Sequence, residues 1–241
     1  MAGHSKWANI KHKKERQDNK RGKIFTKIIK EITISSRIGG SDSAINPRLR
    51  LAIDKALNVN MPKDNIKRAI ERGVGKLEGE NYIELRYEGY GILGSAIMVD
   101  CLTENKTRTI ADVRHAFNKN GGNLGTDGCV SYLFKHQGYL IFSPSYDEEK
   151  LTEIALNLNV EDIVINDDGS FEVITNPNDF TNIRKSFEEQ GFIAEDGEVI
   201  MRAENEVQLF GDDAIKMQKL IDALEDLDDV QNVYTSAVLN F

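Results

Sequence analysis

The sequence has few of the residues that build metal centres and disulfide frameworks, since its 241 residues include two cysteines and four histidines. Cys101 and Cys129 lie far apart, and neither belongs to a Cys-x-x-Cys pair. Zinc sites and disulfide-linked small domains need closely spaced cysteines or a mixed Cys and His cluster. The sequence therefore predicts no metal site, with both cysteines reduced and half-buried in strands.

Long apolar runs are absent as well. No stretch of about 18 apolar residues occurs, which is the length that a transmembrane helix requires. The first residues lack the apolar segment of a secretory signal, and Ala2 follows Met1 where myristoylation requires glycine. We therefore expect a cytoplasmic protein that has no membrane partner.

The motifs of the common enzyme classes are missing too. There is no Gly-x-Ser-x-Gly elbow, no His-Glu-x-x-His helix and no P-loop. Residues 89–94 spell GYGILG, but the apolar, β-branched SAIMVDCL that follows predicts a strand and a hairpin turn, whereas a dinucleotide site leads into a helix. The acidic cluster Glu225, Asp226, Asp228 and Asp229 is predicted to be the solvated end of a helix. The sequence thus predicts no enzyme, no cofactor and no small-molecule substrate.

Positive charge is concentrated at the start of the chain. Residues 1–30, the basic segment, carry ten Lys or Arg and two acids, a net charge of +8 in a chain of −8. Such a segment on an acidic protein is typical of a surface that binds a polyanion, because each neutralised phosphate releases counterions. A solvated charged face and a processed targeting peptide are the alternatives. The candidate nucleic-acid-binding residues are Lys6, Trp7, Lys11, Lys13, Lys14, Arg16, Lys20, Arg21, Lys23, Lys27 and Lys30.

The basic segment continues into a helix predicted over residues 17–38 and closed by Gly39-Gly40. Its lysines lie on the side opposite to its apolar residues, so the basic face is attached to a helix that needs a core. Asn46-Pro47 predicts the start of a second helix, and a third is predicted from Pro62 to Gly73. Trp7 is a candidate either for stacking on a base or for anchoring the segment in a core.

The net charge changes sign near residue 80. Residues 1–80 hold nineteen bases and nine acids, and residues 81–241 hold twelve bases and thirty acids. Strands are predicted at 82–88, 95–102 and 130–134, with a helix at 107–120 between the last two. The polar loop 125–128 is either a plain connection or a carrier of binding residues.

From residue 138 the pattern is strand, helix, strand, strand, helix, strand, which is typical of a ferredoxin-like unit. A helix at 212–227 and a strand at 230–238 then complete the earlier sheet. The predicted fold class is α+β: an N-terminal basic three-helix bundle followed by two sandwich-like α/β domains, one inserted in the other and ferredoxin-like. The predicted domains are residues 1–78, residues 79–136 plus 204–241, and the inserted residues 137–203.

Seven motifs follow one another from Ala2 to about Thr235: GHSKWANIKHKK, RGKIFTKIIKEI, NPRLRLAIDKA, MPKDNIKRAIERG, TRTIADVRHAFNKNGGNLGT, SYLF and ALEDLDDVQNVYT. Together they resemble the YebC/PmpR family, which also contains the mitochondrial translational activator of cytochrome c oxidase. The resemblance implies a DNA-binding transcriptional regulator, and through its mitochondrial branch a ribosome-associated translation factor that binds RNA.

The residues themselves support phosphate binding, because no helix-turn-helix signature with base-reading side chains is visible. The expected partner is therefore a nucleic acid, either promoter DNA or ribosomal RNA. A protein-interaction module that binds acidic partners is a third alternative, since it would use the same basic surface.

Overall fold

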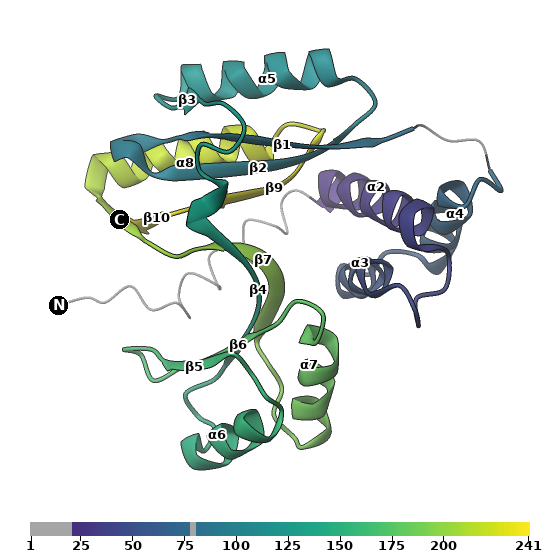
Figure 1. Cartoon of the computed structure of the whole chain (residues 1–241), viewed down its shortest axis with the longest axis vertical. Helices are drawn as coiled ribbons and strands as arrows, with labels where there is room; N and C mark the ends of the chain where they lie inside the picture. Colours follow the sequence, from purple (N-terminus) through teal and green to yellow (C-terminus); the bar gives the residue numbers. More distant parts are fainter. Residues whose placement is uncertain (1–20, 78–80) are drawn as a thin grey trace. The chain divides into compact units, whose positions relative to one another are not determined.

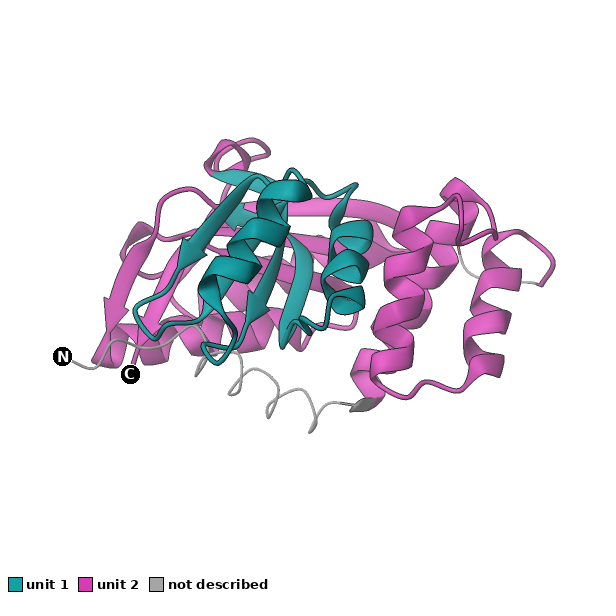
Figure 2. Ribbon diagram, turned by 90° about the horizontal axis from the view of Figure 1, so that it is seen from below, with its two compact units in different colours: residues 1–19, 134–202 teal, residues 20–133, 203–241 magenta. Residues whose placement is uncertain are grey.

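The computed structural model describes residues 21–77 and 81–241 and has the predicted α+β fold (Figure 1). The chain forms two compact units, which Figure 2 colours separately. Residues 134–202 form the smaller one, and the described residues of 21–133 and 203–241 form the larger one. The finer division of the larger unit into a domain of residues 1–78 and a domain of 79–136 plus 204–241 stays a prediction.

The larger unit begins with a bundle of three helices: α2 (Arg21–Gly39), α3 (Pro47–Asn58) and α4 (Lys63–Gly73). α2 packs against both of the other helices, and Ile32, Leu49 and Ala56 are fully buried in their common core. Gly73 of α4 lies directly against the Thr33 carbonyl of α2, where a Cβ atom would clash. The two helices therefore approach closely only because this position is glycine.

The boundaries of these helices follow the predicted signals. The Asn46 side chain accepts the Leu49 N–H at 3.1 Å, and Pro47 occupies the first helical position, where a missing N–H has no consequence. Gly40 has a φ of +83° directly after α2, a conformation that is strained for other residues. The predicted end of the first helix and the predicted start of the second helix are thus confirmed.

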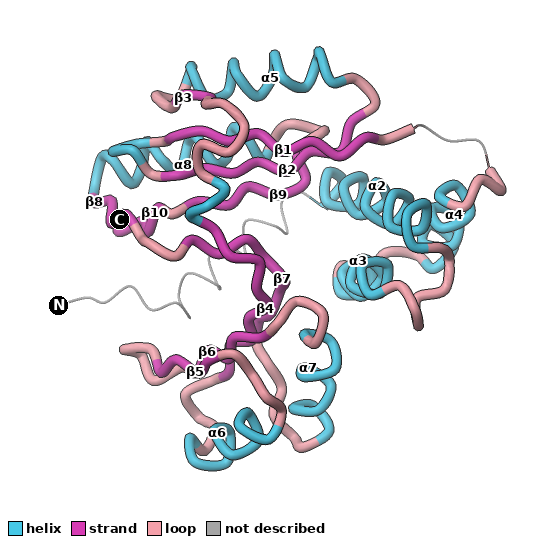
Figure 3. Tube along the Cα trace, in the orientation of Figure 1, coloured by secondary structure: helices cyan, strands magenta, loops and turns pink. Residues whose placement is uncertain are grey.

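A four-stranded sheet follows, with the order β3-β1-β2-β9: β1 (Ile83–Tyr90), β2 (Ala96–Thr103), β3 (Asn123–Leu124) and β9 (Val230–Thr235). β1 and β2 form an antiparallel hairpin through η1 (Ile92–Gly94), so GYGILG is the predicted turn. Two helices, α5 (Lys106–Lys119) and α8 (Gly211–Glu225), share a core with Ile97, Val99 and Cys101, which alternate along β2. Figure 3 shows these strands in magenta and the helices in cyan.

The end of the chain differs from the single predicted strand over 230–238. β9 pairs with β2, but the chain then leaves this sheet at Ser236, and β10 (Ala237–Asn240) pairs in parallel with β8 (Val207–Phe210). Ser236 makes the change possible, because its hydroxyl accepts the Ala96 N–H at 2.8 Å and its carbonyl accepts the Val207 N–H at 2.7 Å. The prediction missed β8 altogether.

The smaller unit contains β4 (Phe134–Phe142), α6 (Glu148–Asn157), β5 (Asp162–Ile165), β6 (Phe171–Thr175), α7 (Phe180–Glu189) and most of β7 (Asp196–Ala203). Its strand order is β5-β6-β4-β7, which is the predicted ferredoxin-like topology. The Phe142 and Phe187 rings, 4.8 Å apart, pack in its core. Arg202 of β7 donates at 2.6 Å to the buried Glu172 of β6 and neutralises it.

The strand predicted over residues 130–134 is wrong. Residues Ser131–Leu133 form a 3-10 turn, η2, and β4 begins only at Phe134. The backbone N–H groups of Val130 and Ser131 donate to the carboxylate of Glu88, so they are not available for pairing with another strand. Both cysteines were predicted to be half-buried in strands, but Cys129 is half-buried in a loop, and Cys101 lies in a strand and is fully buried.

Candidate nucleic-acid interface

The lysines of α2 contact the corner between α8 and β9. Lys23 Nζ donates to the Asp226 carbonyl at 2.9 Å, and Lys27 Nζ donates to the Glu225 carbonyl at 2.7 Å. Lys30 Nζ donates to the Asp228 carbonyl at 3.0 Å. Carbonyl groups at the end of a helix lack intrahelical donors and carry partial negative charge, so cations stabilise them. These three side chains, the α2 lysines, therefore bind part of their own chain.

Asp229 is the centre of this corner. Its carboxylate accepts hydrogen bonds from Lys30 Nζ at 3.0 Å, Arg108 Nη2 at 2.8 Å, and the Thr103 and Thr109 hydroxyls at 3.1 and 2.9 Å. Burial alone would raise the pKa of this carboxyl, but the hydrogen bonds from Arg108, Lys30 and Thr109 outweigh burial and lower the pKa to about 2. A single carboxylate thus joins α2, β2 and α5.

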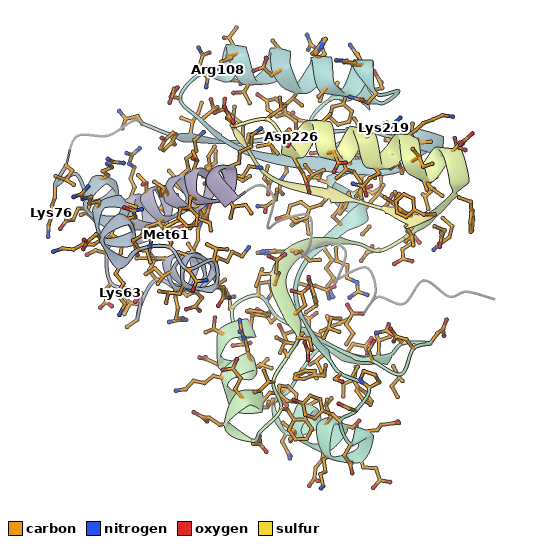
Figure 4. All side chains as sticks on the ribbon, turned by 180° about the vertical axis from the view of Figure 1, so that it is seen from behind. Met61, Lys63, Lys76, Arg108, Lys219 and Asp226 are labelled. Atoms are coloured by element: carbon orange, nitrogen blue, oxygen red, sulfur yellow. The ribbon has the colours of Figure 1, made fainter. Side chains whose placement is uncertain are left out.

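The predicted solvated character of the acidic cluster is wrong for Asp229. Glu225, Asp226 and Asp228 are exposed, as expected for a helix end, whereas the Asp229 side chain is 9% exposed. Its partners come from residues 30, 103, 108 and 109, which are remote in sequence, so no local pattern announces the cluster. Figure 4 labels Asp226 at the end of α8 and Arg108 in the first turn of α5.

The bundle meets the sheet at a second point. Arg48 of α3 donates to Glu31 of α2 at 2.7 Å and also pairs with Glu84 of β1. Burial would lower the pKa of this guanidinium, but hydrogen bonds to both carboxylates raise it overall, so the charge is fixed. Within the larger unit, the bundle is therefore attached to the sheet by two groups of ion pairs.

The structure describes the side chains of three of the predicted binding residues, Lys23, Lys27 and Lys30. Lys23 and Lys27 retain exposed area beside their carbonyl partners, but Lys30 is 8% exposed and its charge is used inside the protein. Its predicted contact with a nucleic acid would require it to leave Asp229. The other candidates lie outside the residues, or the side chains, that the structure describes: Lys6, Trp7, Lys11, Lys13, Lys14, Arg16, Lys20 and Arg21.

A basic surface that the prediction missed lies on α4 and the turn after it. Its members are Lys63, Lys67, Arg68, Arg72 and Lys76, which we call the α4 basic surface. All five are exposed, and none forms an ion pair with another described residue; the acids of the helix are Asp64 and Glu71. Figure 4 labels Lys63 and Lys76 near the two ends of this stretch. Counting exposed charges along the third predicted helix would have identified it.

The loop at residues 125–128 is a structural connection held by Glu88. The buried Glu88 carboxylate accepts the N–H groups of Gly128, Val130 and Ser131 at 3.0, 2.8 and 2.8 Å. Burial would raise the pKa of this carboxyl, but the three backbone donors lower it overall. A row of N–H groups of this kind would otherwise suit an external anion. Because the Glu88 carboxylate already occupies these N–H groups, the structure fits the first of the two predicted roles of the loop, a plain connection.

No group of three or more potential metal ligands gathers among residues 21–77 and 81–241. Over the same residues, no helix has the length and apolar character needed to cross a membrane.

Because the bundle is held by ion pairs, its attachment can be tested by proteolysis. Trypsin is expected to cut first in the basic segment or between Gly73 and Asn81, where Lys76 is exposed and Gly75 has a φ of +77°. The α2 lysines and Arg48 should then keep the two fragments together in size-exclusion chromatography at low salt and release them at high salt. A first cut inside residues 138–202 would contradict the predicted boundary.

The chain matches two family descriptions and several known proteins. "TACO1/YebC protein N-terminal domain" matches residues 5–76, and "TACO1/YebC second and third domain" matches residues 82–237. Proteins named "Probable transcriptional regulatory protein" from Neisseria gonorrhoeae and Chromobacterium violaceum are 69% and 66% identical, with alignments covering 100% and 99% of this chain and 99% of each relative. The crystal structure of a conserved hypothetical protein from Aquifex aeolicus has 42% identity and a TM-score of 0.79, covering 92% of this chain and 91% of that chain. The chain belongs to the TACO1/YebC family.

Proposed function

We propose that this protein is a regulator of transcription that binds DNA through its basic N-terminal part. The observation that carries the proposal is the α4 basic surface, whose five exposed cations have no ion-pair partner among the described residues. Together with the basic segment it gives the first 80 residues a strong positive charge on an otherwise acidic chain. The relatives named probable transcriptional regulatory proteins support the regulatory role.

The mechanism is binding with no chemical step. Lys and Arg side chains of the basic segment and of α4 neutralise phosphates and release counterions, which makes the affinity strongly dependent on salt. Arg68 and Arg72 are the members best suited to bidentate contacts with phosphate oxygens. Acidic surfaces elsewhere on the chain stay outside the nucleic acid, because like charges repel. This role places the protein in the cytoplasm.

RNA on the ribosome is the second candidate target. The observation that favours it is that the bundle offers few side chains for reading bases. The lysines of α2, the longest helix of the bundle, contact the α8 corner. The exposed side of α4 presents cations with few amide side chains. Backbone contacts of this kind recognise shape and charge, as in the recognition of structured RNA. The translational activator in the same family is consistent with this candidate.

The two candidates differ in the expected specificity ratio. A promoter-binding regulator should bind its specific duplex about 10³-fold or more tightly than random duplex at physiological salt, because base recognition must exceed the shared phosphate contribution. Promoter fragments recovered by crosslinking in cells supply the specific duplex, and fluorescence anisotropy gives both dissociation constants. Replacing Lys11, Lys13, Lys14 and Arg16 by Ala should weaken binding to both duplexes and leave the melting temperature unchanged.

A ratio near one would reject the DNA proposal. If the intact protein also co-sediments with ribosomes in lysate, and the fourfold variant does not, the RNA candidate takes its place. A fourfold variant that binds normally would show that these side chains do not contact phosphates.

A further inference from the structure

We propose that the outer face of α5 is a second DNA-contacting surface, which binds the backbone of the same duplex that the basic N-terminal part holds. This inference rests on the proposed function. The outer face of α5 carries Thr107, Ala111, Arg114, His115, Asn118 and Lys119, with one acid, Asp112, beside Lys119, and all of them are exposed. These residues belong to the part of the chain that the composition marks as acidic, where a positive surface is unexpected.

The charge of α5 sets it apart from the other helices of that acidic part. α5 has four bases and one acid, a net charge of +3. α6 has three acids and one base, α7 is neutral, and α8 has four acids and two bases. Residues 134–241 as a whole have seven bases and twenty-four acids. Positive charge is therefore concentrated on this one helix.

The cations of the outer face are also unpaired, unlike those of α7 and unlike Lys216 of α8. Arg184 and Lys185 pair with acids four residues further along α7, and Lys216 pairs with Asp213 on α8. Arg114 and Lys119 form no ion pair with any described residue, although Asp112 lies on the same helix. Their charge is thus available to an external anion.

The geometry of the helix puts five of the outer-face side chains in one stripe, and Lys119 lies at the edge of this stripe, next to Asp112. Residues 107, 111, 114, 115 and 118 follow the spacing i, i+4, i+7, i+8 and i+11, which places them on one side of an α-helix. The opposite side packs into the core through Val113, Ala116 and Phe117. Ala111 in the middle of the stripe has a small side chain, which lets a backbone approach the helix closely.

The chemistry of the stripe fits a sugar–phosphate backbone. Arg and Lys supply charge, and Asn118 and Thr107 supply the neutral donors that commonly accompany phosphate contacts. A protein partner would need a buried aromatic or aliphatic anchor, and a lipid surface would need apolar side chains to insert. Ala111 is the only apolar residue of the stripe, so both of these partners fit poorly.

The Asp229 cluster connects this face to the bundle. Arg108, in the first turn of α5, and Lys30 of α2 donate to the same carboxylate, so this turn is tied to the bundle. A helix of 14 residues is about 21 Å long, which corresponds to roughly six base pairs of duplex. One duplex can therefore extend from the bundle along α5.

The test uses the full-length protein and a 30-base-pair DNA duplex of random sequence, because backbone contacts do not require a specific site. The double substitution Arg114→Ala and Lys119→Ala is expected to weaken binding about tenfold at physiological salt and to lower the salt slope by roughly 1.8. The matched control is Lys216→Ala with Lys219→Ala on α8, which removes the same charge; it should leave both quantities unchanged. Figure 4 labels Lys219.

The outcomes separate this inference from the proposed function. If the fourfold variant of the basic segment loses binding while the α5 variant binds like the unmodified protein, the α5 surface is rejected and the proposed function stands. An equal loss in the α8 control would also reject the α5 surface, because net charge alone would then explain the effect. If the unmodified protein fails to bind any duplex, the proposed function itself fails. Circular dichroism melting confirms that both variants are folded.

Discussion

Replacement of Asp229 by Ala is expected to lower the free energy of unfolding by about 3–5 kcal/mol. The substitution leaves the buried Lys30 ammonium without its carboxylate, and the Thr103 and Thr109 hydroxyls without their acceptor. A buried cation without a partner is far more destabilising than the loss of an exposed pair. Urea denaturation followed by circular dichroism measures the change.

The neighbouring Asp228 supplies the matched control. Its side chain is exposed, so Asp228→Ala removes the same charge and should leave the free energy of unfolding unchanged. The combination of Lys30→Met with Asp229→Leu should recover much of the lost stability, because an apolar pair replaces the buried charges. A loss below about 1 kcal/mol in Asp229→Ala would contradict the buried cluster.

Low pH should also lower the free energy of unfolding of the unmodified protein, because it protonates Asp229. The folded pKa of Asp229 is about 2, below its ordinary value near 3.8. This group therefore contributes its full stabilisation above about pH 4, and the contribution, about 2 kcal/mol, is lost as the pH falls towards 2. Asp229→Asn should flatten this part of the profile of stability against pH.

Replacement of Glu88 by Ala is the second substitution with a large expected effect, a loss of about 2–4 kcal/mol. Three backbone N–H groups lose their acceptor, and Val130 is fully buried, so water cannot replace the carboxylate there. Hydrogen exchange should show the amides of Val130 and Ser131 losing protection more than those of β2.

The conservative substitution Glu88→Gln sharpens this test. One glutamate oxygen accepts the Gly128 N–H and the other accepts two N–H groups, whereas a glutamine amide offers only one oxygen. We expect an intermediate loss, because one backbone donor then faces an NH₂ group. Asp127→Ala, in the exposed part of the same loop, removes the same charge and should change neither stability nor exchange. Equal effects at both positions would mean that charge, and not the hydrogen bonds, is responsible.

Local signals predicted most of the fold. Asn46-Pro47, Gly39-Gly40 and the apolar, β-branched run SAIMVDCL are each local signals, and the structure has the corresponding helix start, helix end and strand. The strand predicted over 130–134 failed because Glu88, more than 40 positions earlier, accepts its N–H groups. A hydrogen bond to a distant side chain leaves no trace in local periodicity.

The positive charge of the candidate site could be predicted from the sequence, but which of its side chains are buried could not. The basic character of the first 80 residues is visible in the sequence, whereas the burial of Lys30 depends on Asp229, 199 positions away. The α4 basic surface was missed for a different reason. Its five cations stand at helical spacing in the sequence, but they are less dense than those of the basic segment and are interspersed with Asp64 and Glu71.

The switch of the final strand at Ser236 determines the order in which a chain emerging from the ribosome can fold. All strands of the smaller unit lie within residues 134–203, so that unit is complete while the rest of the chain is still being made. β2 must wait for β9, and β8 must wait for β10, which ends at Asn240. Until then β2 is an open edge and Lys30 has no Asp229 to bind. The larger unit, although its first residues are synthesised early, is therefore the last to close, and removal of only the final five residues would leave β8 without its partner.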